Sequence, residues 1–91
     1  MIGLTKAAAL EYGRHGIRVN AICPGYIATE LTVGKDSLFT PKSLQAGLDH
    51  TALRRLAAPE EVAALVLWLL SEQASYITGA SYPVDGGYTA N

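Results

Sequence analysis

Residues 16–25 read Gly-Ile-Arg-Val-Asn-Ala-Ile-Cys-Pro-Gly, and this stretch decides the fold class. Residues 17–23 carry apolar side chains at alternate positions, and Ile22 adds apolar surface on the opposite face. A strand that is apolar on both faces belongs inside a parallel sheet that helices cover. Pro24-Gly25 then closes the strand, because this dipeptide is typical of turns. We therefore predict a buried strand at residues 17–23 within an α/β fold.

Helices are predicted on both sides of this strand. Strong helix formers fill the first part of the chain, and Gly13 or Gly16 can supply a left-handed C-terminal turn, so we expect a helix at residues 1–14. Pro59 starts a second helix at residues 59–71, because proline fits the first helical position and the two glutamates after it favour the positive end of the helix dipole. This helix is apolar nearly all round, which predicts burial on more than one side.

A second, shorter strand is predicted at residues 80–84. Pro83 lies in it and cannot donate to a sheet ladder, so the strand should lie at an edge. Between the first strand and the second helix, residues 30–50 are mixed and interrupted by glycine and proline, which indicates a loop with one or two short helices. The order helix, strand, helix, strand predicts that the two strands pair in parallel.

Composition and charge argue against several classes of function. The 91 residues are 49% hydrophobic and 16% charged, which is apolar for so short a chain and suggests surface meant for a partner. The net charge of −1 does not favour nucleic acid. The longest apolar run, residues 62–70, is far below the roughly 20 residues that span a bilayer. We therefore expect no nucleic-acid partner and no membrane partner. A single cysteine fits a reducing compartment, so we also expect the chain to be cytoplasmic.

Local patterns along the whole chain resemble the short-chain dehydrogenase/reductase family. They occur in the family's order, at residues 3–11, 16–29, 55–63 and 76–87. The chain is thus similar to the C-terminal third of such a protein, which is the C-terminal portion of a Rossmann-like doubly wound parallel sheet. The resemblance implies an oxidoreductase that uses NAD or NADP and transfers hydride between the nicotinamide and an alcohol or ketone.

The resemblance also implies a cofactor-binding role for residues 24–29. Pro24 and Gly25 lie at the carboxyl end of the predicted strand, where ligands of open α/β sheets bind, and glycine lets a flat ring approach the main chain closely. In the family this loop lies against the nicotinamide. Main-chain groups at the position of Ile27 bind its carboxamide, and a hydroxyl at the position of Thr29 lies near the cofactor's phosphates.

The substrate side follows from the same resemblance. The position of Tyr26 lines the substrate, and residues 30–50 match the family's substrate-binding loop. Family members associate through helices that match the two predicted here, so we expect a homodimer or homotetramer.

Several of these residues have simpler interpretations. Pro24-Gly25 by itself would be an ordinary strand-ending turn, and Thr29 fits the N-cap of a short helix. Asn20 is expected to satisfy backbone groups at the sheet end, and Asp85 to form a turn. Cys23 is expected to be a small packed side chain rather than a nucleophile.

The family's proton-transfer residues are missing from this sequence. In the family, a lysine four residues after a tyrosine lowers the tyrosine's pKa, but none of the five tyrosines here has that lysine. The glycine-rich phosphate turn is also absent. We therefore assign no catalytic residue and no metal site, and expect an isolated chain that is inactive and binds NAD(P) weakly. The alternative is a non-catalytic remnant that only self-associates or docks onto an intact family member.

Overall fold

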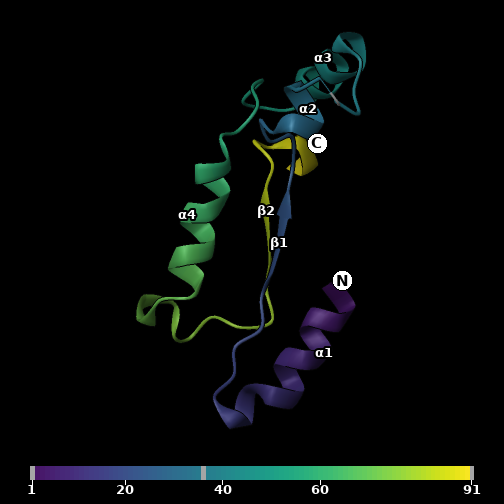
Figure 1. The fold of residues 1–91 in the computed structure, drawn as a ribbon. Coiled ribbons are helices and arrows are strands. Elements are labelled where there is room, and N and C mark those ends of the chain that lie inside the picture. Colours follow the sequence, from purple (N-terminus) through teal and green to yellow (C-terminus); the bar gives the residue numbers. More distant parts are fainter. Residues whose placement is uncertain (1, 36, 91) are drawn as a thin grey trace. The chain divides into compact units, whose positions relative to one another are not determined.

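The computed structural model describes residues 2–35 and 37–90, with only the backbone described for Glu30 and Leu31. The helices and strands in chain order are α1 (Ile2–Tyr12), β1 (Ala21–Pro24), α2 (Glu30–Val33), α3 (Pro41–Asp49), α4 (Pro59–Leu69) and β2 (Ser81–Val84) (Figure 1). Single turns of 3-10 helix follow at Gly13–His15, Glu72–Ala74 and Tyr88–Ala90. This order confirms the predicted α/β class. None of the helices described here is long and apolar enough to cross a membrane.

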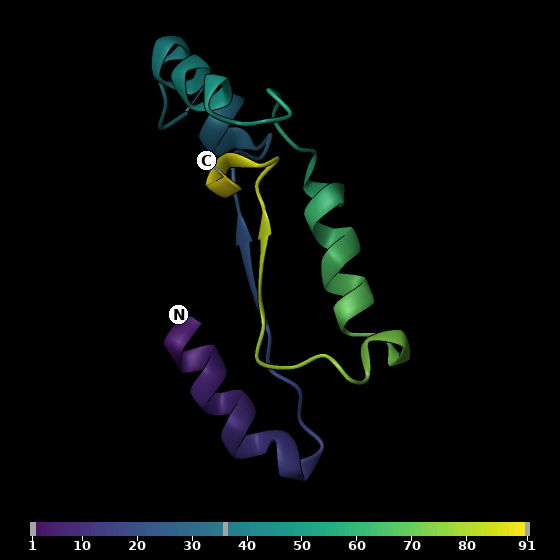
Figure 2. The ribbon, with the colours of Figure 1, turned by 180° about the vertical axis from the view of Figure 1, so that it is seen from behind.

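The sheet consists of β1 and β2, which run in parallel as predicted (Figure 2). The Ala21 N–H donates to the Ala80 carbonyl, and the Gly25 N–H donates to the Val84 carbonyl, both at 2.9 Å. These two hydrogen bonds advance in the same direction along both strands, which is the pattern of a parallel ladder.

The first strand is shorter than predicted, because β1 begins at Ala21 rather than at residue 17. The residues before it hydrogen-bond outside a regular ladder: the Val19 N–H donates to the Thr78 hydroxyl at 3.0 Å. The Asn20 amide donates to the Ile77 carbonyl at 3.1 Å and accepts from the Ala80 N–H at 3.2 Å. Before β1, these side-chain bonds accompany a single backbone bond, from the Gly79 N–H to the Val19 carbonyl at 2.7 Å, and the predicted structural role of Asn20 is confirmed.

The chain divides into two compact units, of which the first comprises Met1–Cys23 and Ala64–Tyr82. Its turn after α1 is left-handed at Gly16, where φ is +75°. The side chains that this unit buries are mostly small: Thr5, Ala9, Ala21, Leu69 and Ala74.

Two predictions of burial in this first unit are wrong. In α4, Leu69 is 6% exposed, but Leu67 is 70% exposed, so the helix is buried on one face and not on several. Cys23 is also exposed rather than packed. Apolar side chains permit burial, but the sequence of one element does not tell which of them other parts of the fold cover.

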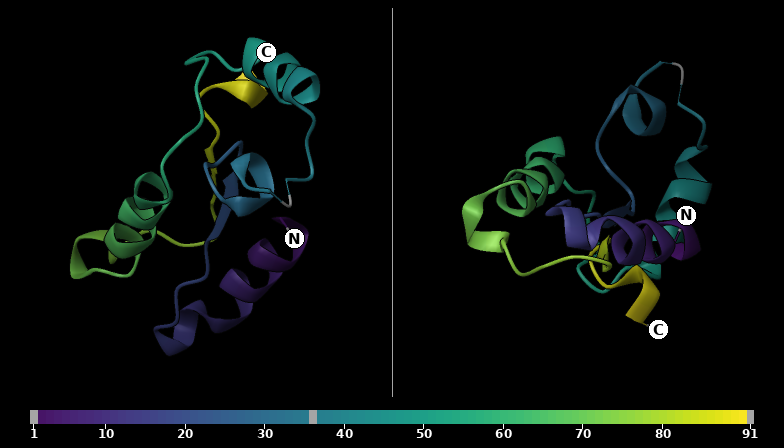
Figure 3. Two further views of the ribbon diagram at one scale, coloured as in Figure 1. Left: turned by 45° about the horizontal axis from the view of Figure 1, so that its top comes forward. Right: turned by 90° about the horizontal axis from the view of Figure 1, so that it is seen from below.

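The second unit comprises Pro24–Ala63 and Pro83–Asn91, and Figure 3 shows its helices α2 and α3 with the C-terminal turn. Helix α3 begins at Pro41 and is capped by Thr40, whose hydroxyl accepts from the Ser43 N–H at 3.0 Å. The predicted turn at Asp85 is confirmed, because its carboxylate accepts hydrogen bonds from the N–H groups of Gly87 and Thr89.

Candidate functional site

Gly25 brings the ends of the two strands together. Its N–H donates to the Val84 carbonyl, and a Cβ at this position would lie 2.8 Å from both Cα and Cβ of Asp85. Real Cβ atoms essentially never come so close, so a larger residue would push the main chain of Asp85 away. The need for glycine therefore has a reason within the fold, in addition to any ligand. Pro24, which precedes it, is the exposed last residue of β1.

Ile27 lies opposite Ala57 in an isolated parallel bridge. The Ala57 N–H donates to the Tyr26 carbonyl at 3.0 Å, and the Ala28 N–H donates to the Ala57 carbonyl at 2.8 Å. In such a bridge the middle residue points its own N–H and carbonyl to the other side. The Ile27 carbonyl accepts from the Thr32 hydroxyl, whereas its N–H has no hydrogen-bond partner among the described residues. This N–H is therefore free to donate to a ligand.

Thr29 starts helix α2 with its main chain. Its carbonyl accepts from the N–H groups of Thr32 at 3.0 Å and Val33 at 2.9 Å, and its own N–H donates to the Thr32 hydroxyl at 2.9 Å. The Thr29 side chain is exposed, and its hydroxyl forms no hydrogen bond with any residue that the structure describes. Thr29 thus takes the N-cap position without a side-chain cap, and its hydroxyl remains open to a ligand.

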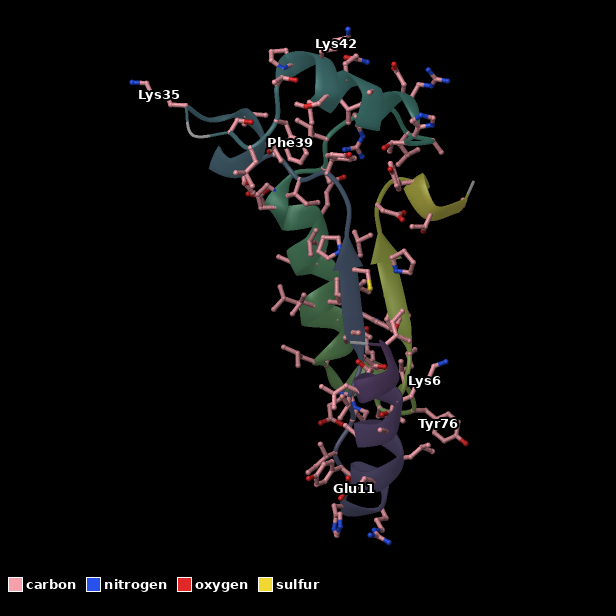
Figure 4. All side chains as sticks on the ribbon, turned by 90° about the vertical axis from the view of Figure 1, so that its right-hand side faces the viewer. Lys6, Glu11, Lys35, Phe39, Lys42 and Tyr76 are labelled. Atoms are coloured by element: carbon pink, nitrogen blue, oxygen red, sulfur yellow. The ribbon has the colours of Figure 1, made fainter. Side chains whose placement is uncertain are left out.

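Tyr26 is half-buried within an aromatic cluster. Its ring meets those of Phe39 and Tyr88 edge to face, with centroids 5.5 and 5.9 Å apart. Gly47 of α3 lies so close that a methyl group there would approach the Tyr26 Cε2 to 2.7 Å. Figure 4 shows Phe39 directed inward, while Lys35 and Lys42 point outward. Tyr26 therefore contacts the segment predicted to line the substrate, through partners that no local sequence pattern identified.

A small pocket of about 100 Å³ lies next to Tyr26 in the same unit. It is lined by Tyr26, Thr51, Leu53, Arg55, Ala57, Glu61, Val84, Asp85 and Gly86. Of the predicted site residues, only Tyr26 is in this lining. Ile27 and Thr29 do not line this pocket, although Ala57, which pairs with Ile27, does.

The carboxylates on the pocket wall are already paired. Arg55 donates to both oxygens of Glu61 at 2.9 and 3.0 Å, and the Ala58 N–H donates to Glu61 at 2.7 Å. The hydrogen bonds from Arg55 and then from Ala58 lower the pKa of Glu61 from 4.5 to about 2, and the pKa of Arg55 is raised. The Thr89 hydroxyl and neighbouring N–H groups lower the pKa of Asp85. These carboxylates therefore stabilise turns, as Glu61 does by capping α4.

Other chemistry is sparse in the part of the chain that the structure describes. No three His, Cys, Asp or Glu side chains lie close enough there to hold a metal ion. The arrangement offers hydrogen-bond donors at a strand end and an aromatic wall, which suit binding and orientation of a ligand.

The chain is similar to known proteins over nearly its whole length. A family model described as Enoyl-(Acyl carrier protein) reductase matches residues 1–89. Over 85 residues the chain is 48% identical to the short chain dehydrogenase/reductase astE of Aspergillus oryzae, covering 93% of this chain and 33% of that protein. Over 86 residues it is 48% identical to the galactitol 2-dehydrogenase (L-tagatose-forming) of Cereibacter sphaeroides, covering 94% and 33%. The chain therefore spans about a third of the length of these relatives.

Solved structures give the same result. The chain matches 4-hydroxyisoleucine dehydrogenase complexed with NADH at a TM-score of 0.86 and 41% identity, covering 99% of this chain and 36% of that one. It matches the TT0495 protein of Thermus thermophilus at a TM-score of 0.87 and 40% identity, covering 99% and 37%. The likeness thus extends over nearly all of this chain.

Proposed function

Because the chain belongs to the short-chain dehydrogenase/reductase family, in the group described as enoyl-(acyl carrier protein) reductase, we propose that it is the C-terminal part of an NAD(P)-dependent oxidoreductase. The reaction of the whole protein would transfer hydride between the nicotinamide and an alcohol or ketone. Relatives named as dehydrogenases support this class of substrate, and a solved relative complexed with NADH supports the cofactor. A cytoplasmic location is part of the same proposal.

The observation that carries the proposal is the Ile27 N–H just after the carboxyl end of β1, which has no hydrogen-bond partner among the described residues. Ligands of open α/β sheets bind at this end of the strands, and a carboxamide oxygen is a suitable acceptor for the N–H. The Thr29 hydroxyl is open to a phosphate oxygen on the same loop, Pro24 and Gly25 form the turn beneath it, and Tyr26 faces the substrate segment. The nicotinamide, when bound, would supply the hydride acceptor or donor, and these residues would bind and orient it.

We expect the 91-residue chain by itself to bind NAD(P) weakly and to oxidise or reduce nothing. The sequence contributes the nicotinamide end of the site but neither the family's tyrosine–lysine pair nor its phosphate turn. Binding through residues 24–29 alone should give a dissociation constant of about 1 mM.

An NADH titration followed by amide resonances tests both parts of this proposal. The Ile27 and Thr29 resonances should move, with a dissociation constant of about 1 mM. A Tyr76→Ala variant is the control, because that ring is fully exposed in the other unit and should not affect binding. Micromolar affinity, turnover of any alcohol, or a titration that leaves residues 24–29 unmoved would each contradict the proposal.

A second candidate function is association without catalysis, either with a second copy as a homodimer or homotetramer or with an intact family member. The observation that favours it is the number of large apolar side chains that the first unit leaves exposed, among them Leu4, Leu10, Leu67 and Leu70. Covering each of these would contribute roughly 1.5–3 kcal/mol. A chain that assembles but gives no NADH response would favour this second function over the first.

A further inference from the structure

The hydroxyl of Thr32 gathers three main-chain groups of the preceding loop. It accepts from the Thr29 N–H at 2.9 Å, and it lies within donor distance of the Ile27 carbonyl and of the Thr29 carbonyl, the latter at 3.0 Å. A threonine hydroxyl has one proton and two lone pairs, so it donates to one carbonyl at a time while it accepts from the N–H. The contact with Ile27 is the shorter of the two.

The two contacts of Thr32 with Thr29 are typical of a helix start, but its contact with Ile27 is not. Bonds between a side chain and the main chain three residues earlier are common at helix N-termini, and they account for Thr29. The bond to Ile27 reaches five residues back, beyond the first residue of α2, into the segment that carries the candidate cofactor contacts. Helix capping alone therefore does not explain the position of the Thr32 side chain.

The loop is held from both sides as a result. On one side Ala57 bonds to Tyr26 and Ala28, and on the other side Thr32 bonds to Ile27 and Thr29. Of the three consecutive N–H groups at residues 27–29, those of Ala28 and Thr29 are used internally. The Ile27 N–H has no partner in the described part of the chain, and the bonds of the neighbouring peptide groups set its direction.

We propose that Thr32 is a positioning residue: its hydroxyl fixes the peptide group that follows Ile27, while the Ala57–Tyr26 bond fixes the one that precedes it, so that the Ile27 N–H is aimed at the nicotinamide carboxamide before the cofactor arrives. This inference rests on the proposed function, because it assumes that residues 24–29 bind NAD(P). A donor that is fixed beforehand loses less conformational freedom on binding, which raises affinity without adding a contact.

The test is an NADH titration of the full chain, followed by amide resonances, with Thr32→Val and Thr32→Ser. Valine removes the hydroxyl and keeps the shape, so the dissociation constant should rise about three- to tenfold, the range expected for one hydrogen bond. The free-protein resonances of Ile27 and Ala28 should also move. Serine keeps the hydroxyl and should leave affinity within about twofold of the original chain.

Thr40→Val provides the matched control. The Thr40 hydroxyl caps α3 in the same unit and makes no contact with residues 27–29 among the described interactions. Its loss should lower stability but leave NADH affinity within about twofold. Equal weakening by Thr40→Val and Thr32→Val would show that Thr32 acts only through stability, and unchanged affinity in Thr32→Val would also overturn the proposal.

A separate readout distinguishes failure of this inference from failure of the proposed function. Hydrogen exchange at the Thr29 amide should be slow in the original chain and in Thr32→Ser, and fast in Thr32→Val. If NADH moves no resonance of the original chain, the proposed function fails and the positioning role fails with it, while Thr29 exchange still reports whether the hydroxyl holds the loop. Thr32→Ala replaces valine in both measurements if the valine variant does not fold.

Discussion

The two compact units differ in what stabilises them. The first unit buries mainly small side chains and one leucine, and it exposes leucines of both α1 and α4. The second unit is tied together by side-chain hydrogen bonds at its turns, from Thr32, Thr51, Asp85 and the Arg55–Glu61 pair. Large exposed apolar side chains are available for association, whereas polar groups fixed at turns can hold a ligand loop in one geometry. The two proposed functions divide accordingly: association would use the first unit, and binding of a small molecule would use the second.

The largest expected effect is in the C-terminal turn of the second unit, at Gly87. Its φ is +92°, and a Cβ there would lie 2.5 Å from the Cβ of Ala52. Gly87→Ala combines left-handed strain with overpacking, so urea unfolding should show a loss of about 2–4 kcal/mol.

Alanine substitutions at two glycines of the first unit distinguish the effect of left-handed strain from that of overpacking. At Gly16 φ is also positive, at +75°, but no atom lies near a Cβ, so Gly16→Ala should cost only the strain of about 1–2 kcal/mol. Gly3 lies in α1 with open space around it, and Gly3→Ala should stabilise by up to about 1 kcal/mol. Similar losses at Gly87 and Gly16 would mean that the close approach of Ala52 to Gly87 adds no cost beyond the left-handed strain.

A smaller effect is expected on association. Leu10 is 86% exposed in the first unit and Leu38 is 76% exposed in the second, so the two leucines are matched in exposure. Sedimentation equilibrium should show a dimer or larger species at micromolar concentration, which Leu10→Lys weakens at least about tenfold, because it replaces apolar contact area by a charge. Leu38→Lys should change association less than about twofold. If the original chain is monomeric, or if the two substitutions have equal effects, then association does not depend on the first unit in particular.

The smallest effect is the pH dependence that Glu61 gives to the second unit. Its pKa in the folded chain is about 2, below the ordinary value of 4.5, so its contribution to stability is present above pH 4.5 and is lost as the pH falls toward 2. Both side chains of the Arg55–Glu61 pair are about half exposed, so the contribution should be small and reduced by salt.

Unfolding of Glu61→Gln should therefore differ from the original chain at pH 7 and converge with it near pH 2. Glu60→Gln is the control, because Glu60 forms no ion pair within the described residues. A gap that persists unchanged at pH 2 would show that the carboxylate charge is not its cause.

The sequence by itself determined the α/β class, the element order and the parallel pairing of the strands. These follow from local signals, which are alternating apolar residues at 17–23, the proline and glutamates at the start of α4, and the glycines after Asp85. The roles of Asn20 and Asp85 were also predictable, because both side chains bond to backbone groups at strand ends and turns, where such residues are typical.

Only the tertiary structure decided where the strand begins, which face of α4 is buried, and what surrounds Tyr26. The Val19–Thr78 bond shortens β1, and the Phe39 and Tyr88 rings reach Tyr26 from distant parts of the chain. The direction of the Ile27 N–H likewise depends on Ala57, which is far along the chain, and the bond at the Ile27 carbonyl depends on the rotamer of Thr32. Periodicity reports which face of an element is apolar, but contacts between residues far apart in the chain, and the direction of a single hydroxyl, are set only when the chain has folded.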